Sequence, residues 1–148
     1  MNNIYIAAEH CGITLKKYLL EQLFDLKIKD VYPVEDSSDD YPDVARILAL
    51  AMKNYENAMG IVICGSGQGI CMAMNRFAHI RASQPRTALE ATLTREHNDS
   101  NVACFGASVM DKEDIASVIR VFVSTPASTE QRHVRRVNKM SEPSYSKV

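Results

Sequence analysis

The chain has 148 residues, of which 46% are hydrophobic, and a formal net charge of −1. This length and apolar content suit one domain, which we expect to span residues 1–148. A net charge near zero gives no general attraction for nucleic acid or anionic membranes. No apolar run approaches the roughly 20 residues that cross a bilayer, and the first residues lack a signal-peptide pattern. We therefore expect a soluble, cytoplasmic protein that acts on a small molecule.

Short apolar segments alternate with helical patterns along the whole chain. The predicted strands cover residues 3–8, 28–34, 59–64, 79–83 and 101–105. Such alternation is typical of βαβ units, in which crossover helices cover both faces of a parallel sheet. The sequence thus predicts an α/β fold with a five-stranded parallel sheet.

Apolar residues at helical spacing predict the helices between these strands. The first helix carries Leu15, Leu19, Leu23 and Leu26, and the second has Pro42 in its first turn. A later helix begins after Asp111, whose carboxylate is placed to cap it. A basic helix covers about 128–140, and residues 141–148 form a polar tail that we expect to fray.

The most informative segment is the end of the third predicted strand, where Cys64 is followed by Gly65, Ser66, Gly67, Gln68 and Gly69. Alternating glycines allow several backbone N–H groups to approach a bound anion, and the helix that follows adds the positive end of its dipole. A thiol at this place is biased toward the reactive thiolate. The alternative is a tight turn with a buried cysteine that acts as a small hydrophobe.

Polar residues follow the other predicted strands as well. Glu9 and His10 follow the first strand, and Ser38–Asp40 follows the second. In an open parallel sheet, ligands bind outside the carboxyl ends of the strands. We therefore expect these segments to converge with Cys64–Gly69 on one edge of the sheet. Asp40 could equally be a helix cap, and His10 could bond the backbone.

The segment Glu96–Asp99 precedes the last predicted strand and is expected to be a polar loop that joins the same edge. A histidine with an ordinary pKa near ~6.5 suits proton transfer at neutral pH, which makes His97 a candidate acid or base. The alternative is that His97 is a capping or surface residue.

Near the end of the chain, Arg132 and Arg136 share one face of the basic helix by their i, i+4 spacing. Two guanidinium groups on one face match the bidentate geometry of a phosphate. The alternative is a solvated surface cluster. The spacing therefore favours a phosphorylated small molecule as the ligand.

Several other chemistries do not fit the spacing. The glycines at 65, 67 and 69 match neither a P-loop nor a dinucleotide fingerprint, and Ile70 stands where a cysteine phosphatase needs an arginine. The four cysteines form no C-x-x-C pair, so we expect neither a disulfide framework nor a metal, and we interpret Cys11, Cys71 and Cys104 as packing residues.

Taken together, these motifs resemble the ribose-5-phosphate isomerase B family over nearly the whole chain. The residues that carry the resemblance are Glu9–Gly12, Asp40–Asp43, Cys64–Gly69, Asn75–Phe77, Ile80–Arg81, His97–Asn101, Phe105–Gly106, and Arg132, His133 and Arg136. The resemblance implies a Rossmann-like three-layer α/β/α sandwich with a C-terminal helix. It also implies the interconversion of ribose 5-phosphate and ribulose 5-phosphate in the pentose phosphate pathway, without metal or cofactor.

The resemblance also implies roles for individual residues. Cys64 would be the base that removes the proton next to the sugar carbonyl, and His97 would open the sugar ring. Ser66 and the loop residues Gly65, Gly67, Gln68 and Gly69 would hold the oxygens of the enediolate. Sugar or phosphate oxygens would be contacted by Glu9, His10, Asp40, Asn98, Arg132 and Arg136. The C-terminal arginines would reach the site of a neighbouring subunit, which implies a homodimer or homotetramer with shared active sites.

Two positions depart from the family pattern. Glu9 stands where relatives usually have Asp, and Ser108 stands where many relatives carry an arginine that contacts phosphate. Two alternatives therefore stay open. The chain could isomerise another phosphosugar of the galactose 6-phosphate or allose 6-phosphate type, although Cys64 weighs against the former. It could also be a catalytically silent regulator that binds phosphosugars.

Overall fold

A five-stranded sheet lies at the centre of the computed structural model, which describes residues 3–36 and 38–145. The strands are β1 (Ile4–Ala8), β2 (Lys29–Asp30), β3 (Met59–Cys64), β4 (Ala82–Ser83) and β5 (Val102–Gly106). Their order across the sheet is β2-β1-β3-β5-β4, and every neighbouring pair is parallel. The predicted parallel sheet is therefore confirmed. The last part of the predicted tail, 146–148, lies outside the described residues.

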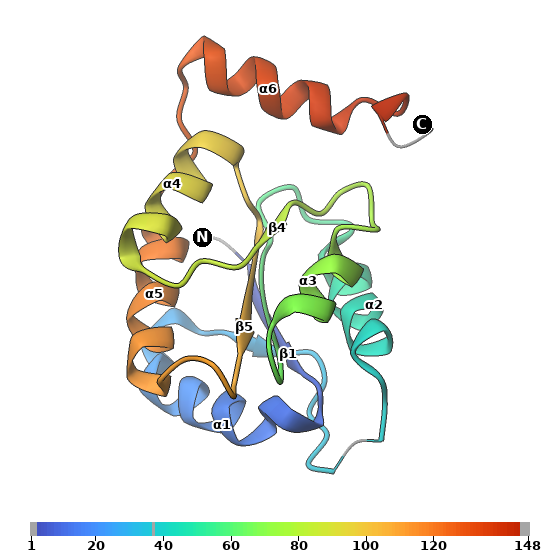
Figure 1. Cartoon of the computed structure of the whole chain (residues 1–148), viewed down its shortest axis with the longest axis vertical. Coiled ribbons are helices and arrows are strands. Elements are labelled where there is room, and N and C mark those ends of the chain that lie inside the picture. The colour runs from blue at the N-terminus through green and yellow to red at the C-terminus, as the bar shows by residue number, and fades with distance from the viewer. Residues whose placement is uncertain (1–2, 37, 146–148) are drawn as a thin grey trace.

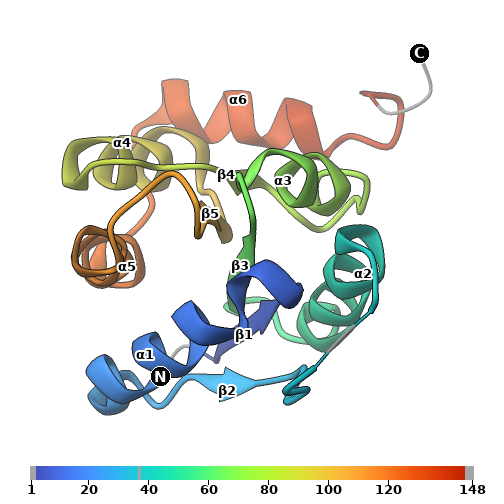
Figure 2. The same ribbon diagram turned by 60° about the horizontal axis from the view of Figure 1, so that its bottom comes forward.

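The helices form a layer on each face of the sheet (Figures 1 and 2). They are α1 (Ile13–Gln22), α2 (Tyr41–Met52), α3 (Gln68–Met74), α4 (Ala88–Asn98), α5 (Lys112–Ser124) and α6 (Gln131–Ser141), with short 3-10 turns η1 (His10–Gly12) and η2 (Phe24–Leu26). One buried cluster joins the sheet to α1, α4 and α5, and a second joins it to α2 and α3. This confirms the three-layer α/β/α architecture.

The central strands match the predicted ranges closely because they are apolar and fully buried. β1, β3 and β5 have no exposed position. The edge strands β2 and β4 have two residues each, much shorter than predicted, and their residues are half-buried or exposed. Asp40 and Asp111 occupy N-cap positions, but neither side chain makes a capping hydrogen bond to its helix.

The expectation of a polar loop at Glu96–Asp99 is wrong for its first three residues. Thr87 caps α4 by accepting a hydrogen bond from the N–H of Glu90 at 3.1 Å, and the helix then continues through Asn98. Asp99 ends the helix in a left-handed conformation with φ of 45°. Polar residues continue the helix here because the last turn buries only Arg95, whose guanidinium is hydrogen-bonded, and needs no apolar face.

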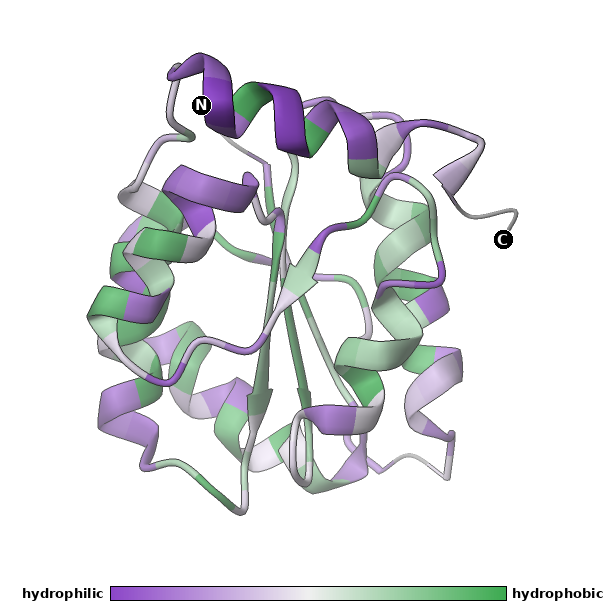
Figure 3. Cartoon of the chain, turned by 45° about the horizontal axis from the view of Figure 1, so that its top comes forward, coloured by the Kyte–Doolittle hydropathy of each residue, from purple (hydrophilic) through white to green (hydrophobic). Residues whose placement is uncertain are grey.

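The C-terminal helix α6 lies across the edge of the sheet at which the strands begin (Figure 1). It starts at Gln131, three residues later than predicted, and ends at Ser141. Its surface is mostly hydrophilic (Figure 3). A buried histidine of this helix, His133, packs against α4. Among the described helices, none is long and apolar enough to cross a membrane.

Candidate active site

The loop that follows Cys64 connects β3 to α3. Cys64 is the last residue of β3, and its side chain is buried, with the residue 5% exposed. The backbone N–H of Gly67, the N-cap of α3, donates a hydrogen bond to Cys64 Sγ at 3.1 Å. A donor at this distance stabilises negative charge on the sulfur. The sulfur therefore sits at a turn built to support an anion.

The shape of this loop depends on glycine at 67. Gly67 has a φ of 79°, a region that side chains disfavour, and a Cβ there would lie 2.9 Å from the backbone nitrogen of Gly106. Gly106 in turn leaves no room for a side chain, since a Cβ would stand 2.4 Å from the carbonyl of Ser66. The β3–α3 loop thus packs backbone to backbone against the end of β5.

Hydrogen bonds hold the loop in this position. The N–H of Ala107 donates to the carbonyl of Cys64, and the N–H of Ser108 donates to that of Gly65, both at 2.9 Å. Gln84 Nε2 donates to the carbonyl of Ser66 at 2.7 Å. The hydroxyl of Ser66 accepts from the N–H of Gln68 at 3.3 Å and stays on the exposed side of the loop. The loop is therefore fixed before any ligand arrives.

The end of β1 lies next to this loop. The N–H of Glu9 donates to the carbonyl of Ile63 at 2.9 Å, and the buried Glu9 carboxylate contacts Nδ1 of the exposed His10. Cys11 Sγ is 3.9 Å from the position that a Cβ on Gly65 would take. Partial desolvation of the thiol, followed by the charge of Glu9, raises the pKa of Cys11. Cys11 is exposed, so its interpretation as a packing residue is wrong.

The other two cysteines pack as expected. Cys104 is fully buried in β5, where burial raises its pKa well above the usual value. Cys71 is half-buried on α3 beside it, and a hydrogen bond with Cys104 lowers the pKa of Cys71. These two thiols belong to the core between α3 and the sheet.

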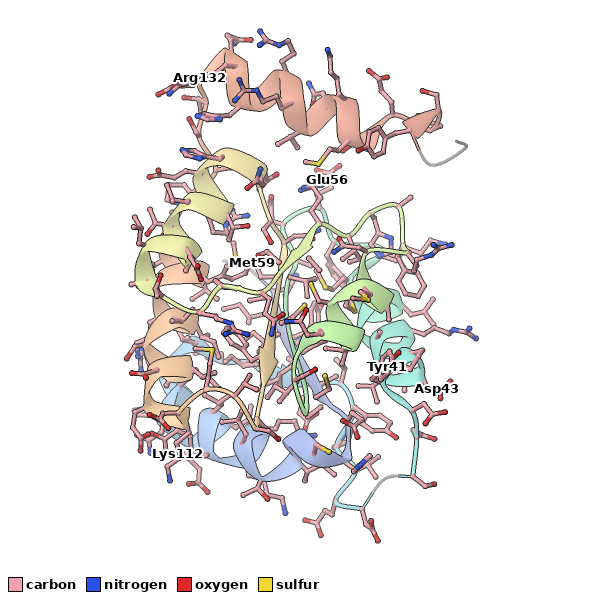
Figure 4. The ribbon with its side chains drawn as sticks, in the orientation of Figure 1. Tyr41, Asp43, Glu56, Met59, Lys112 and Arg132 are labelled. Carbon is pink, nitrogen blue, oxygen red and sulfur yellow. The ribbon has the colours of Figure 1, made fainter. Side chains whose placement is uncertain are left out.

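Tyr41 is a residue of this edge that the sequence interpretation did not select. Its ring stacks on Gly69, where a Cβ would come within 2.7 Å of the ring carbons, yet the residue is 43% exposed. Asp40, directly before it, is also exposed. Tyr41 and Asp43 lie near the carboxyl ends of the strands in Figure 4. The sequence signal that could have identified Tyr41 is its position directly after the candidate acid Asp40.

A second group of candidate residues lies at the opposite edge of the sheet. The rings of His97 and His133 stack with centroids 4.3 Å apart and planes 9° from parallel. Arg132 Nε bonds Glu130 Oε2 at 2.8 Å, and Arg136 and Asn98 are exposed. In Figure 4, Arg132 lies at the other end of the molecule from Tyr41. These residues present imidazole, amide and guanidinium groups to the surrounding solvent.

The environment of His133 keeps it neutral. Burial, followed by the charges of His97 and Arg132, lowers its pKa. Its Nδ1 atom is buried and has no hydrogen-bond partner among the described residues. His133 therefore acts as an uncharged platform for the ring of His97.

The expectation that His97 joins Cys64 on one edge of the same chain is wrong. β5 pairs with β3 from Val102 opposite Gly60 to Gly106 opposite Cys64, so the segment before β5 lies where β3 begins. The four residue steps from Gly60 to Cys64 correspond to about 13 Å along the strand. The structure brings Glu9, His10, Asp40 and the glycine loop together, and it places His97, Asn98, Arg132 and Arg136 elsewhere.

Comparisons with known proteins agree with this architecture. The sequence profile of the Ribose/Galactose Isomerase family matches residues 4–140. The chain is 37% identical over 140 residues to a probable ribose-5-phosphate isomerase B of Mycoplasma pneumoniae, covering 93% of this chain and 91% of that protein. It is 34% identical over 143 residues to ribose-5-phosphate isomerase B of Escherichia coli, covering 95% of each.

Solved structures show the same likeness. The crystal structure of ribose-5-phosphate isomerase B from Mycoplasma genitalium with bound ribulose-5-phosphate superposes with a TM-score of 0.88 at 34% identity, covering 99% of this chain and 97% of that chain. The type B enzyme of Trypanosoma cruzi gives a TM-score of 0.90 at 31% identity, with both chains covered completely. The profile match and these full-length relatives show that the chain belongs to the ribose/galactose isomerase family.

Proposed function

We propose that this protein interconverts ribose 5-phosphate and ribulose 5-phosphate, as an enzyme that needs neither metal nor cofactor and acts in the cytoplasm. The observation that carries the proposal is the hydrogen bond from the Gly67 N–H to the sulfur of Cys64. It places a thiolate-stabilising donor in a glycine loop at the carboxyl ends of the strands, where ligands of parallel sheets bind. The names of the full-length relatives support the same reaction.

In the proposed mechanism, the Cys64 thiolate removes the proton from the sugar carbon next to the carbonyl. The electron pair moves to the carbonyl oxygen and gives an enediolate. Backbone N–H groups of the loop from Gly65 to Gly69, with the Ser66 hydroxyl, stabilise its oxygens as an oxyanion hole does. The hydroxyl proton of the deprotonated carbon then passes to the former carbonyl oxygen, and the Cys64 thiol returns its proton to the former carbonyl carbon. The deprotonated carbon becomes the new carbonyl, which completes the aldose to ketose conversion without net consumption of protons. The side chains of Glu9, His10 and Asp40 contact sugar hydroxyls.

We further propose that each site is completed by a second copy of the chain. His97 opens the sugar ring, Asn98 positions it, and Arg132 and Arg136 hold the phosphate. All four lie on α4 or α6, at the far edge of their own sheet, as Arg132 shows in Figure 4. Large apolar side chains support an interface nearby: Met72 on α3 is 68% exposed and Leu89 on α4 is 66% exposed. A homodimer, or a homotetramer built from it, would cover them.

The phosphosugar preference depends on two residues at the rim. Ser108 is exposed and offers a neutral hydroxyl, and the carboxylate of Glu9 is buried against His10. A site with one fewer guanidinium has a weaker hold on phosphate, so its selection relies more on the sugar hydroxyls. A six-carbon phosphosugar of the allose or galactose type is therefore the second candidate substrate.

The decisive experiment measures ribulose 5-phosphate formed from ribose 5-phosphate by the wild type, Cys64→Ala and Cys71→Ala. Removal of a general base lowers kcat by about 10² to 10⁴, so Cys64→Ala loses nearly all turnover. Cys71→Ala removes a half-buried thiol from the neighbouring helix and keeps the activity. Full turnover by Cys64→Ala would reject the mechanism, and a wild type that binds the sugar without turnover would identify a silent regulator. The same assay with six-carbon phosphosugars ranks the substrates.

A further inference from the structure

The end of β1 carries three side chains of different chemistry that meet at one point. Glu9, His10 and Cys11 each offer one ligand atom, and these atoms all lie within 4.8 Å of one another. Glu9 is 5% exposed, whereas His10 and Cys11 are exposed. The proposed isomerisation uses Glu9 and His10 as sugar contacts and leaves Cys11 without a role. The proposed reaction therefore does not explain why a thiol lies beside Glu9 and His10.

The backbone that carries this cluster is fixed. The N–H of Gly12 donates to the carbonyl of Glu9 at 2.7 Å, which closes the turn η1. A Cβ on Gly12 would lie 2.4 Å from a methyl carbon of Ile63, so the turn packs directly against β3. Because the backbone that presents the three side chains is already fixed, a ligand needs to order only the side chains of His10 and Cys11 when it binds.

The donor set is that of a zinc site. Zinc takes carboxylate oxygen, imidazole nitrogen and thiolate sulfur, with bonds of about 2.0 Å to nitrogen and oxygen and about 2.3 Å to sulfur. Tetrahedral bonds of these lengths place donor atoms about 3.5 Å apart. The three donors already lie within 4.8 Å, and the Glu9 carboxylate contacts His10. Because His10 and Cys11 are exposed, rotation of their side chains can bring the three donor atoms to the spacing that a zinc ion needs.

The charge at this point also favours a cation. The carboxylate of Glu9 is buried against Nδ1 of His10, and Cys11 Sγ lies within 4.8 Å of the donor atoms of both residues. A divalent cation between Glu9 and Cys11 would offset the negative charge of the carboxylate, and its binding would release the thiol proton to solvent.

We propose that Glu9, His10 and Cys11 bind a zinc ion, and that bound zinc reversibly inhibits the isomerase by withdrawing Glu9 and His10 from the sugar. The first half of the proposal stands on the cluster itself. The second half rests on the proposed function. Zinc would compete with the sugar, because both need the same two side chains.

Binding is tested with zinc chloride on the purified full-length chain, in the presence of a phosphine reductant that keeps thiols reduced. Calorimetric titration of the wild type gives one zinc per chain, and Cys11→Ala weakens the affinity at least tenfold. Cys71→Ala, the matched thiol control, and Cys64→Ala bind as the wild type does. Cobalt(II) gives a thiolate-to-cobalt charge-transfer band in the near ultraviolet with the wild type and not with Cys11→Ala. Equal zinc affinity of Cys11→Ala and wild type, or loss of binding in Cys64→Ala alone, overturns the site.

Inhibition is tested by turnover of ribose 5-phosphate with and without zinc. Zinc raises the apparent KM of the wild type, and a chelator restores it. Cys11→Ala keeps the zinc-free activity and resists zinc at concentrations that inhibit Cys71→Ala. Equal inhibition of Cys11→Ala and Cys71→Ala by zinc would overturn the proposal that zinc at this cluster inhibits the isomerase. If the chain shows no isomerase activity, the binding titration still decides the zinc site, so the two proposals fail separately.

Discussion

The turn that holds Cys64 gives a quantitative test at Gly67. Replacement by alanine forces a side chain into a backbone with φ of 79°, which costs roughly 1–2 kcal/mol. The new Cβ also stands 2.5 Å from Gln84 Nε2, which can swing away, and 2.9 Å from the backbone of Gly106, which cannot. Crowding of this kind adds roughly 1–3 kcal/mol. We therefore expect Gly67→Ala to lower the free energy of unfolding by about 2–5 kcal/mol.

The matched control is Gly65→Ala in the same loop. A Cβ on Gly65 meets Cys11 at 3.9 Å, an ordinary contact, and φ there is not in the left-handed region. We expect its cost to stay below about 1 kcal/mol. Thermal unfolding at equal protein concentration measures the difference, with a melting temperature roughly 6–15 °C lower for Gly67→Ala. Equal melting temperatures for the two variants would show that the strain and crowding argument is wrong.

Three other predictions concern the opposite edge of the sheet. Co-expressed Cys64→Ala and His97→Ala chains should form mixed dimers in which one of the two shared sites is intact. About half of randomly assembled dimers are mixed, so we expect about a quarter of the wild-type turnover. The absence of turnover in the mixture would contradict a site shared between two copies. Burial lowers the pKa of His133 below its ordinary 6.5, so the unfolded chain takes up a proton at this residue more readily than the folded protein does. Folding stability is therefore unaffected by the protonation of His133 above about pH 6.5 and decreases as the pH falls from 6.5 toward the lower pKa of the folded state. Denaturant unfolding at several pH values should show that the stability of His133→Asn no longer decreases in this range. The same pH dependence in wild type and variant would show that His133 is not its cause. Arg95 is 5% exposed and donates hydrogen bonds to the carbonyls of Thr125 and Ser100 and to the carboxylate of Asp99. Arg95→Ala should therefore lower the free energy of unfolding in urea by about 3 kcal/mol, whereas the control Arg46→Ala, at an exposed position, should lower it by less than about 0.5 kcal/mol. Similar urea midpoints for the two variants would contradict a structural role of the Arg95 hydrogen bonds.

The fold was largely predictable because burial leaves a strong pattern. β3 and β5 are buried at every position and flanked by turn residues, so their ranges followed from the apolar runs. The edge strands have little buried surface and were overestimated. The last turn of α4 was missed because its residues are polar, and its one buried member, Arg95, is a charged residue that sequence patterns assign to the surface.

The candidate site was harder to predict because a sequence does not show which end of a strand a segment meets. His97 precedes β5, and in a parallel sheet such a residue lies at the opposite edge from one that follows β3. Tyr41 and Cys11 were not selected because their importance comes from contact with Gly69 and Glu9 across the fold. The glycine loop was recognised because its chemistry is local.

The packing of Gly106 against Ser66 separates what must stay constant in this site from what is free to vary. The wall behind the sulfur is made of main chain, with no space for a side chain on Gly106. Ser108 ties down the loop through its N–H, so almost any residue at that position can do the same. Variation at positions 9 and 108 can therefore change the side chains at the rim of this loop, while the main-chain turn that holds Cys64 stays the same.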